Sequence, residues 1–328
     1  MKINGPINII RLEGTIFNIK KIIYIYFDHH YPLNKQTKCD GYLNDDIVTF
    51  LNKEFLKIHD KTIDFFMETS FDQEEELLKN IHYKDRYIDE VNKFFISNIL
   101  VKNNKNLGTK INKNIRFHYI DIRYEFKTIS FSKIFNHMKN NIENNKDNKE
   151  FINKIIFELN NLKTILKNED NKIIYKLKNK YIHNEIKNKM NILLDKVYKD
   201  IDKLKIEINT ISTINQIDTT YLKLLQLYSW LMDIYFLRRF LDKNYVNNAI
   251  IYCGSGHAIR YIYFLIKNFD FKITNASFLN KPIGLVNEIL RYYEEKDDID
   301  NDTSIIHLFN NKTNIQCIDI STFPENFS

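Results

Sequence analysis

The chain has 328 residues, of which 44% are apolar and 27% are charged, and its formal net charge is +6 at pH 7. This composition is typical of a soluble globular protein with one or two domains, and the lack of any run of 18 apolar residues argues against a membrane span. Heavy use of Asn, Lys and Ile indicates an AT-rich coding sequence, as in some intracellular parasites and large DNA viruses. The positive charge therefore does not by itself indicate a nucleic-acid partner.

The first third of the chain predicts strands that alternate with helices. Short β-branched, apolar runs predict buried strands, and an apolar face repeated every three to four residues predicts a helix. The predicted strands lie at 7–12, 22–27, 63–67 and 115–122, and the predicted helices at 44–57 and 73–101.

Residues 130–245 contain no good strand pattern and predict a helical insertion. One amphipathic helix contains Ile152 to Leu166, and another begins after a cap at 218–220. Strand and helix patterns return after 245, with expected strands at 249–253, 271–274, 305–309 and 315–320 and a helix from about 257 to 267.

These patterns predict an α/β fold class, with a mainly parallel mixed sheet that is flanked by helices and carries a large helical insertion. Residues 1–128 form the N-terminal part of the α/β domain, 129–245 the insertion, and 246–328 the C-terminal part.

The three cysteines, Cys39, Cys253 and Cys317, are widely spaced and contain no CxxC pair. An odd and sparse set argues against a disulfide scaffold and fits a reducing compartment. Cys253 lies in an expected buried strand. No signal peptide is expected, because Asn4 and Arg11 interrupt any apolar start. We therefore expect a soluble protein of the cytoplasm.

Polar residues follow four of the predicted strands. In an open α/β sheet, ligands bind in the crevice at the carboxyl ends of the strands, so these residues are candidates for a shared site. They are Asp28 and His30 in FDHH, Glu68 in DFFMETS, Asp121 and Arg123 in HYIDIR, and His257 in GSGH.

Each of these groups has a functional and a structural interpretation. Asp28 and His30 are two residues apart, so in extended backbone they share a side, where they can act as an acid–base pair or as metal ligands. Otherwise Asp28 caps a turn. Glu68 is either a site carboxylate or a loop acid. Arg123 either faces the crevice and binds an anion or pairs with Asp121.

Gly254 and Gly256 stand between a predicted strand and a helix in a chain with only seven glycines. Such glycines indicate a demanding turn or close approach to a ligand, and the helix behind them offers free N–H groups. A dinucleotide fingerprint is not supported, because Ile259 occupies the position of its third glycine. The alternative is an ordinary junction with an incidental His257.

The order of these residues resembles the superfamily that joins the TraB and TIKI proteins, the ChaN haem-binding lipoproteins and the erythromycin esterases. FDHH at 27–30 stands for the early Gly-Glu-x-His motif, with Asp28 for Glu and Phe27 for the first Gly. Glu68 matches the strand-end Glu, and GSGH at 254–257 matches the late Gly-x-x-His. Arg239 matches an Arg of TIKI-like members.

The resemblance implies metal-dependent peptide cleavage, ester hydrolysis or haem-iron binding, depending on the branch of the superfamily. The sequence thus predicts a hydrolase with a small-molecule or peptide substrate. Its catalytic residues would be Asp28, His30, Glu68, His257, Arg123 and Arg239, its cofactor-binding glycines Gly254 and Gly256, and its ligands for a divalent metal His30, His257 and Glu68. In a metal-free version, one histidine is the base.

Two alternatives belong to other classes of protein. A binding or structural protein that retains the fold without catalysis would account for Phe27 in place of the motif glycine. A nucleic-acid-binding module would account for the net positive charge. However, lysines are spread throughout the chain, and no recognisable motif interleaves them with aromatic residues. A nucleic-acid partner is therefore not expected.

Overall fold

In the computed structural model, the chain forms two compact units. The first unit comprises Met1–Asp121 and Lys243–Ser328, and the second Ile122–Asp242. The structure describes residues 1–35, 38–40, 44–69, 86–102, 105–123, 131–174, 180–294, 302–310 and 315–328.

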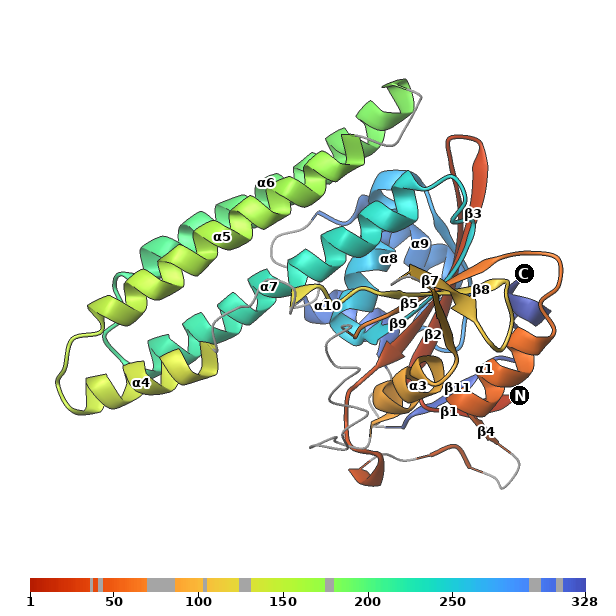
Figure 1. Cartoon of the computed structure of the whole chain (residues 1–328), viewed down its shortest axis with the longest axis horizontal. Helices are drawn as coiled ribbons and strands as arrows, with labels where there is room; N and C mark the ends of the chain where they lie inside the picture. The colour runs from red at the N-terminus through yellow and green to blue at the C-terminus, as the bar shows by residue number, and fades with distance from the viewer. Residues whose placement is uncertain are drawn as a thin grey trace. The chain divides into compact units, whose positions relative to one another are not determined.

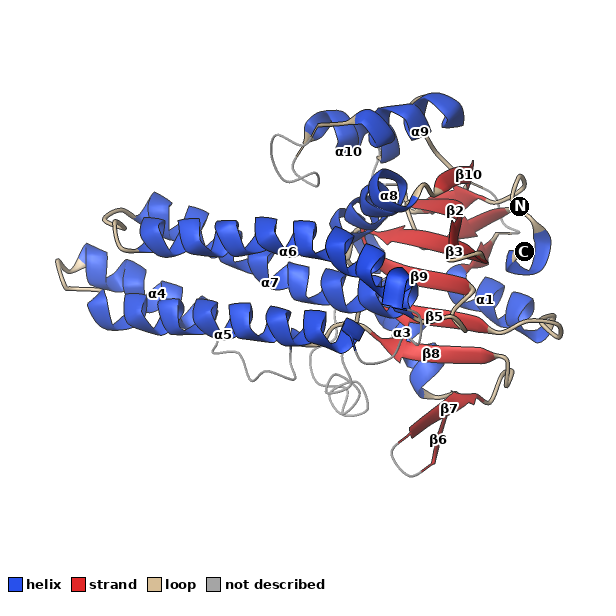
Figure 2. Cartoon of the chain, turned by 90° about the horizontal axis from the view of Figure 1, so that it is seen from above, coloured by secondary structure: helices blue, strands red, loops and turns tan. Residues whose placement is uncertain are grey.

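The first unit is built on a six-stranded sheet in the order β10-β2-β3-β9-β5-β8, which Figure 2 shows. β2 and β3 form an antiparallel hairpin and β10 pairs antiparallel with β2, whereas the pairs β3–β9, β9–β5 and β5–β8 are parallel. The sheet is therefore mixed, and its parallel half carries the strands whose ends were singled out in the sequence. The strands are β2 (Asn8–Ile16), β3 (Ile19–Asp28), β5 (Ile63–Met67), β8 (Ile115–Tyr119), β9 (Asn248–Gly254) and β10 (Lys272–Ala276).

Helices of the first unit complete the α/β class that the alternating patterns predicted. α1 and α3 bury their apolar faces in one core with side chains of β3, β5 and β9, among them Tyr26, Phe65 and Tyr252. α8 packs against β2, β3 and β9, and α9 packs against α8 and β10. These helices are α1 (Ile47–Leu56), α3 (Tyr87–Ile96), α8 (Ser255–Phe269), α9 (Ile283–Tyr292) and α10 (Thr303–Phe309).

Short elements join distant parts of the first unit. β1 pairs with β11 and with β4, and β6 pairs with β7. The remaining elements are β1 (Lys2–Asn4), η1 (Leu33–Lys35), β4 (Asp45–Asp46), β6 (Ile99–Lys102), β7 (Lys105–Thr109), β11 (Cys317–Asp319) and η3 (Glu325–Phe327).

Cys39 and Cys317 form a disulfide, with 4.9 Å between their Cα atoms. The expectation of no disulfide was therefore wrong. Spacing along the chain carried no sign of the pair, because the two cysteines are 278 residues apart and meet only when β11 pairs with β1. Cys253 keeps its thiol and is fully buried, as predicted.

The second unit consists of helices in its described residues (Figure 1). α5, α6 and α7 pack against one another, and α4 packs against α7. Their bounds are α4 (Phe131–Glu143), α5 (Lys149–Ile174), α6 (Lys180–Ile208) and α7 (Ile214–Asp242). No helix in the described ranges is both long and apolar enough to cross a membrane.

Several predicted boundaries were wrong for local reasons. α7 begins at Ile214 rather than after 218–220, because Thr213 and Gln216 form a capping box in which each side chain accepts a backbone N–H of the other residue. Residues 303–309 are helical rather than extended, since Asp302 caps them by accepting the N–H of Ser304 at 2.8 Å. The predicted helix at 73–101 overlaps α3, but its end lies in β6, and residues 70–85 lie outside the described residues.

Candidate functional site

Three of the four polar groups meet at the carboxyl edge of the parallel strands. β9 lies between β3 and β5, so Gly254 at its end has Asp28 as its register partner on one side. On the other side the N–H of Glu68 donates to the carbonyl of Tyr252 at 3.1 Å. The tertiary structure thus brings residues 28, 68 and 254 together, as the sequence pattern predicted for strand ends at one edge.

Glu68 is the centre of the site because both imidazoles contact its carboxylate. Nε2 of His30 lies 3.5 Å from Oε2, and Nε2 of His257 lies 3.4 Å from Oε1. The Glu68 side chain is only 11% exposed. Burial alone would raise the pKa of Glu68, but the charge and hydrogen bonds of His257 and His30 hold it well below the ordinary value. The carboxylate is therefore ionised at neutral pH.

Gly254 allows this close packing through its small size. Its backbone N–H donates to Oε2 of Glu68 at 2.6 Å. A Cβ at this position would lie 2.9 Å from Nε2 of His30 and 3.4 Å from Oε2 of Glu68. The residue has an ordinary φ of −60°, so the need is for space and not for an unusual backbone conformation. It caps α8, whose positive end faces the carboxylate.

His30 reaches the site through a turn and not along an extended strand. β3 ends at Asp28, and His30 has a φ of 55°, in the left-handed region. The Asp28 carboxylate accepts the backbone N–H of His30, which fixes this turn. The side chains of Asp28 and His30 contact each other, as expected. The expected cause, an extended backbone at these residues, was wrong, because His30 lies in a turn.

His30 is held between two carboxylates. Its Nδ1 lies 3.1 Å from Oδ1 of Asp28, an ion-pair contact without hydrogen-bond alignment. Burial lowers the pKa of His30, but its interactions with Asp28 and Glu68 outweigh that effect and raise the pKa to about 10. The imidazole is therefore a cation at neutral pH. The adjacent His29 has a ring centroid 5.4 Å from that of Tyr31, and burial lowers its pKa.

Two residues near the site were not expected from the sequence. The hydroxyl of Tyr252, which is fully buried, donates to Oδ2 of Asp28 at 2.8 Å. Arg86 forms a two-pronged contact with Asp89, and the negative charges of Asp28 and Glu68 contribute to raising its pKa. Tyr252 stands two residues before Gly254 in β9, a spacing that places them on one face of the strand. No comparable pattern marks Arg86.

His118 and Asp121 have structural partners. Asp64 is fully buried, and its carboxylate contacts Nε2 of His118 at 2.7 Å and both Nε and Nη2 of Arg116. The backbone N–H of Asp121 donates to the carbonyl of Thr69 at 3.2 Å. Asp64, Arg116 and His118 thus join β5 to β8.

Arg123, Arg239 and Gly256 complete the set of predicted site residues. Arg123 and Arg239 belong to the helical unit, where Arg239 donates to the hydroxyl of Tyr235 at 3.1 Å. Gly256 is in the first turn of α8, two residues after Gly254, and α8 itself begins at Ser255 rather than at His257.

The predicted metal ligands are close together, but they do not form a ready-made set. Within the part of the chain that the structure describes, no three His, Cys, Asp or Glu side chains are arranged to hold a metal ion. Nε2 of each imidazole contacts a different oxygen of Glu68, one of the other predicted ligands. His30 would also have to lose the proton that Asp28 and Glu68 stabilise.

The geometry defines a class of site: two imidazoles and a buried carboxylate at the strand ends of an α/β protein. Such a set can transfer protons and stabilise developing negative charge.

The chain belongs to a family of unknown function, DUF5847, whose sequence profile matches residues 1–174 and 209–328. It is 30% identical to the uncharacterized protein R161 of Acanthamoeba polyphaga mimivirus, over all of this chain and 98% of R161. It is 31% identical to the uncharacterized protein R160 of the same virus, over 99% of this chain and 97% of R160. No solved structure matches the chain.

Proposed function

We propose that the protein is a hydrolase that cleaves an ester or peptide bond at the His30–Glu68–His257 site. The observation that carries the proposal is that one buried carboxylate contacts two imidazoles from separate strand ends. In this arrangement Glu68 orients His257 as a general base, while cationic His30 stabilises an oxyanion.

The proposed roles follow from the contacts that the two imidazoles make with Glu68. In its neutral form, with the Nε2 proton directed at Glu68, His257 has a lone pair on Nδ1, and that nitrogen takes a proton from the attacking water. The water oxygen bonds to the substrate carbonyl carbon, and the negative charge that forms on the carbonyl oxygen lies beside His30. The proton then passes from His257 to the leaving group as the ester or amide bond breaks.

The resemblance to the TraB, TIKI, ChaN and erythromycin-esterase superfamily supports a hydrolase and is part of the proposal. Asp28, His30, Glu68, Gly254 and His257 are the residues that carry the resemblance, and they are the ones that come together in the first unit. The negative charges of Asp28 and Glu68 contribute to raising the pKa of Arg86, so Arg86 is a further candidate for the arginine that supports the site.

The test is hydrolysis by the full chain purified without a histidine tag, on p-nitrophenyl esters and fluorogenic peptides. We expect His257→Ala and Glu68→Gln each to lower kcat/KM by about 100-fold or more. His307→Ala is the matched control, because His307 lies in α10, outside the site. The proposal is refuted if the wild-type protein hydrolyses the substrates no faster than His257→Ala and Glu68→Gln do.

A metal-dependent version places a divalent ion on His30, Glu68 and His257 and requires their side chains to turn toward a common point. Metal analysis of the untagged protein and of His257→Ala separates the two versions. Stoichiometric metal that is lost in the variant favours the metal-dependent version, and metal-free wild-type protein with full activity rules it out.

A second candidate is a binding or structural protein that uses the same residues as an ion-pair network. The observation in its favour is that His30 already contacts two carboxylates, as structural networks do. It predicts that Glu68→Gln lowers the free energy of unfolding while neither wild type nor variant hydrolyses any substrate of the panel.

A further inference from the structure

The net positive charge of the chain lies in its helical unit. Residues 122–242 contain 22 Lys and Arg against 15 Asp and Glu, a net charge of +7. The α/β unit, residues 1–121 and 243–328, contains 26 against 27 and is nearly neutral. An AT-rich coding bias enriches lysine along the whole chain, so it does not explain a charge that is confined to one unit. The helical unit is therefore the part of the chain that suits an anionic partner.

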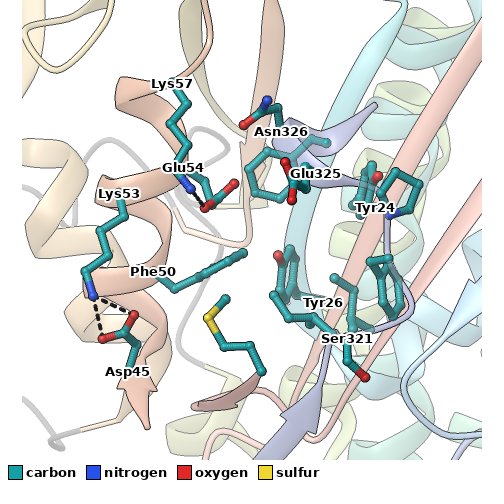
Figure 3. Close-up of a pocket in the computed structure, with 16 residues that line it drawn as sticks. Tyr24, Tyr26, Asp45, Phe50, Lys53, Glu54, Lys57, Ser321, Glu325 and Asn326 are labelled. Atoms are coloured by element: carbon teal, nitrogen blue, oxygen red, sulfur yellow. Dashed lines mark hydrogen bonds and ion pairs between the residues drawn. The ribbon is translucent and has the colours of Figure 1, made fainter. Parts of the chain in front are cut away.

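Lysines of the α/β unit illustrate its charge balance. Figure 3 shows two of them beside α1, where Lys53 contacts both carboxylate oxygens of Asp45 at 2.8 Å and Lys57 pairs with Glu54. Glu325 adds a further negative charge to the same surface. This part of the α/β unit thus offers no spare positive charge for an anion.

One face of α6 is buried inside the helical unit. Seven buried apolar residues between Ile186 and Ile208 recur at spacings of three or four residues, and α6 packs against α5 and α7. Spacings of this kind place the seven side chains on one side of the helix. The opposite side of α6 therefore points away from this apolar contact.

That opposite side carries two isoleucines and three lysines, which we call the α6 stripe. Its members are Ile192, Lys196, Lys199, Lys203 and Ile206. Successive members are three or four residues apart, so they lie in one row along the helix, about 21 Å long at 1.5 Å per residue. Ile192 is 67% exposed and Ile206 is 71% exposed, and Lys199 and Lys203 are exposed as well. The row thus presents both charge and apolar surface to the solvent.

The positive charge of the α6 stripe is available to a partner. Lys199 and Lys203 form no ion pair within the residues that the structure describes. Asp202 borders the stripe, but it already contacts Lys163 at 2.8 Å and Lys205 at 3.4 Å. The exposed Asp195 also borders the stripe, so the lysines of the row outnumber the acids whose charge is not already balanced.

The exposed isoleucines distinguish between kinds of anionic partner. Nucleic acids are recognised most often through arginine, and the α6 stripe contains none. A phosphodiester backbone also offers no apolar surface for Ile192 and Ile206. An anionic lipid bilayer offers both kinds of contact, because its headgroups attract lysines and the boundary below them accepts apolar side chains.

We infer that the α6 stripe binds the surface of an anionic phospholipid bilayer, with the axis of α6 parallel to that surface. The ammonium groups of the lysines contact the lipid headgroups, and Ile192 and Ile206 enter the boundary between headgroups and acyl chains. The contact is peripheral and needs no helix that crosses the membrane. The inference is independent of the proposed hydrolase activity, because it rests on different residues.

The test is sedimentation of the full chain with vesicles of phosphatidylserine and phosphatidylcholine in equal parts, and with vesicles of phosphatidylcholine alone. We expect binding to the first kind only, and binding that weakens as the salt concentration rises. Lys199→Gln combined with Lys203→Gln should weaken it about 25-fold, since each lysine near an anionic surface contributes about 1 kcal/mol, or about fivefold. Lys272→Gln combined with Lys281→Gln is the matched control, because it removes the same charge from exposed positions of the α/β unit.

Ile192→Gln combined with Ile206→Gln tests the apolar part of the contact. It should weaken binding to the phosphatidylserine vesicles by at least about fivefold, although the net charge is unchanged. Leu285→Gln is its control, because Leu285 is 44% exposed in α9 of the α/β unit. The substituted positions are all exposed, so the variants should fold as wild type does, which circular dichroism checks.

The inference fails if the wild-type chain does not sediment with the phosphatidylserine vesicles, or if the two α6 double variants bind them as tightly as wild type. An equal loss of binding in the Lys272 and Lys281 control would show that net charge alone holds the protein at the vesicle, and would overturn the inference too. Tighter binding to a mixed-sequence DNA duplex than to the vesicles would assign the charge of the helical unit to nucleic acid and would overturn it as well.

Discussion

Gly254 and His30 are so close that a methyl group on the glycine would lie 2.9 Å from Nε2 of the imidazole. In the same site, a hydrogen bond joins Tyr252 to Asp28, which is 224 positions away in the sequence. The site is therefore a close-packed set of polar groups in which each position depends on its neighbours, and single changes should have large effects.

Gly254→Ala should displace His30 from Glu68, because the methyl group has no space between them. We expect a fall in hydrolytic activity of at least about tenfold, since misplacement of a reacting group by an ångström costs on the order of 100-fold. Gly284→Ala is the control, because a Cβ added there would have no described atom within 4 Å. Equal activity of the two variants would show that the contact at residue 254 does not matter.

The stability of the protein should depend on pH through His30. Its pKa is raised from 6.5 to about 10 in the folded protein, so the contribution is complete below pH 6.5 and is lost as pH rises through about 10. The Tm of wild type should fall across this window, and His30→Gln should show a smaller fall. Parallel curves for the two proteins would contradict the assignment.

Glu68 should affect stability at the opposite end of the pH range. Its folded pKa is lowered well below 4.5, so its contribution is present above the unfolded value and is lost as pH falls toward the folded one. Acid unfolding of wild type should therefore be steeper than that of Glu68→Gln. Circular dichroism during acid titration measures the difference, and identical acid midpoints would argue against an ionised Glu68.

Tyr252→Phe should destabilise the protein by roughly 1.5–3 kcal/mol, the usual range for a hydrogen bond to a charged group, because Oδ2 of the buried Asp28 carboxylate loses its hydroxyl donor. Tyr292→Phe is the matched control, since Tyr292 is 76% exposed. Urea unfolding measures both. A loss that is no larger than that of Tyr292→Phe would mean that Asp28 finds another donor.

Reduction of the Cys39–Cys317 disulfide should lower the Tm, because the bond closes a span of 278 residues and so restricts the unfolded chain. Cys39→Ser should lower the Tm to the same extent and remove the response to reductant. Cys253 stays a buried thiol in both proteins. A Tm that reductant does not change in wild type would show that the bond contributes nothing to stability.

The sequence alone determined the α/β class, the helical stretch in the middle and three of the strand ends that form the site. Apolar runs and helical spacing are local properties, and they predicted β3, β5 and β9 together with Asp28, Glu68 and Gly254 at or just after their ends. Local patterns gave the wrong boundary or element where a helix cap or a turn determined the structure. Examples are the start of α7, the helix α10 and the turn to His30.

Only the tertiary structure decided which of these residues meet. Strand order placed β9 between β3 and β5, and this order depends on how the whole sheet buries its faces, which no single segment specifies. The same long-range pairing joined Cys39 to Cys317 and brought the hydroxyl of Tyr252 to Asp28. Contacts of this kind arise between residues that are far apart in the sequence, so their physical cause is the packing of the complete chain.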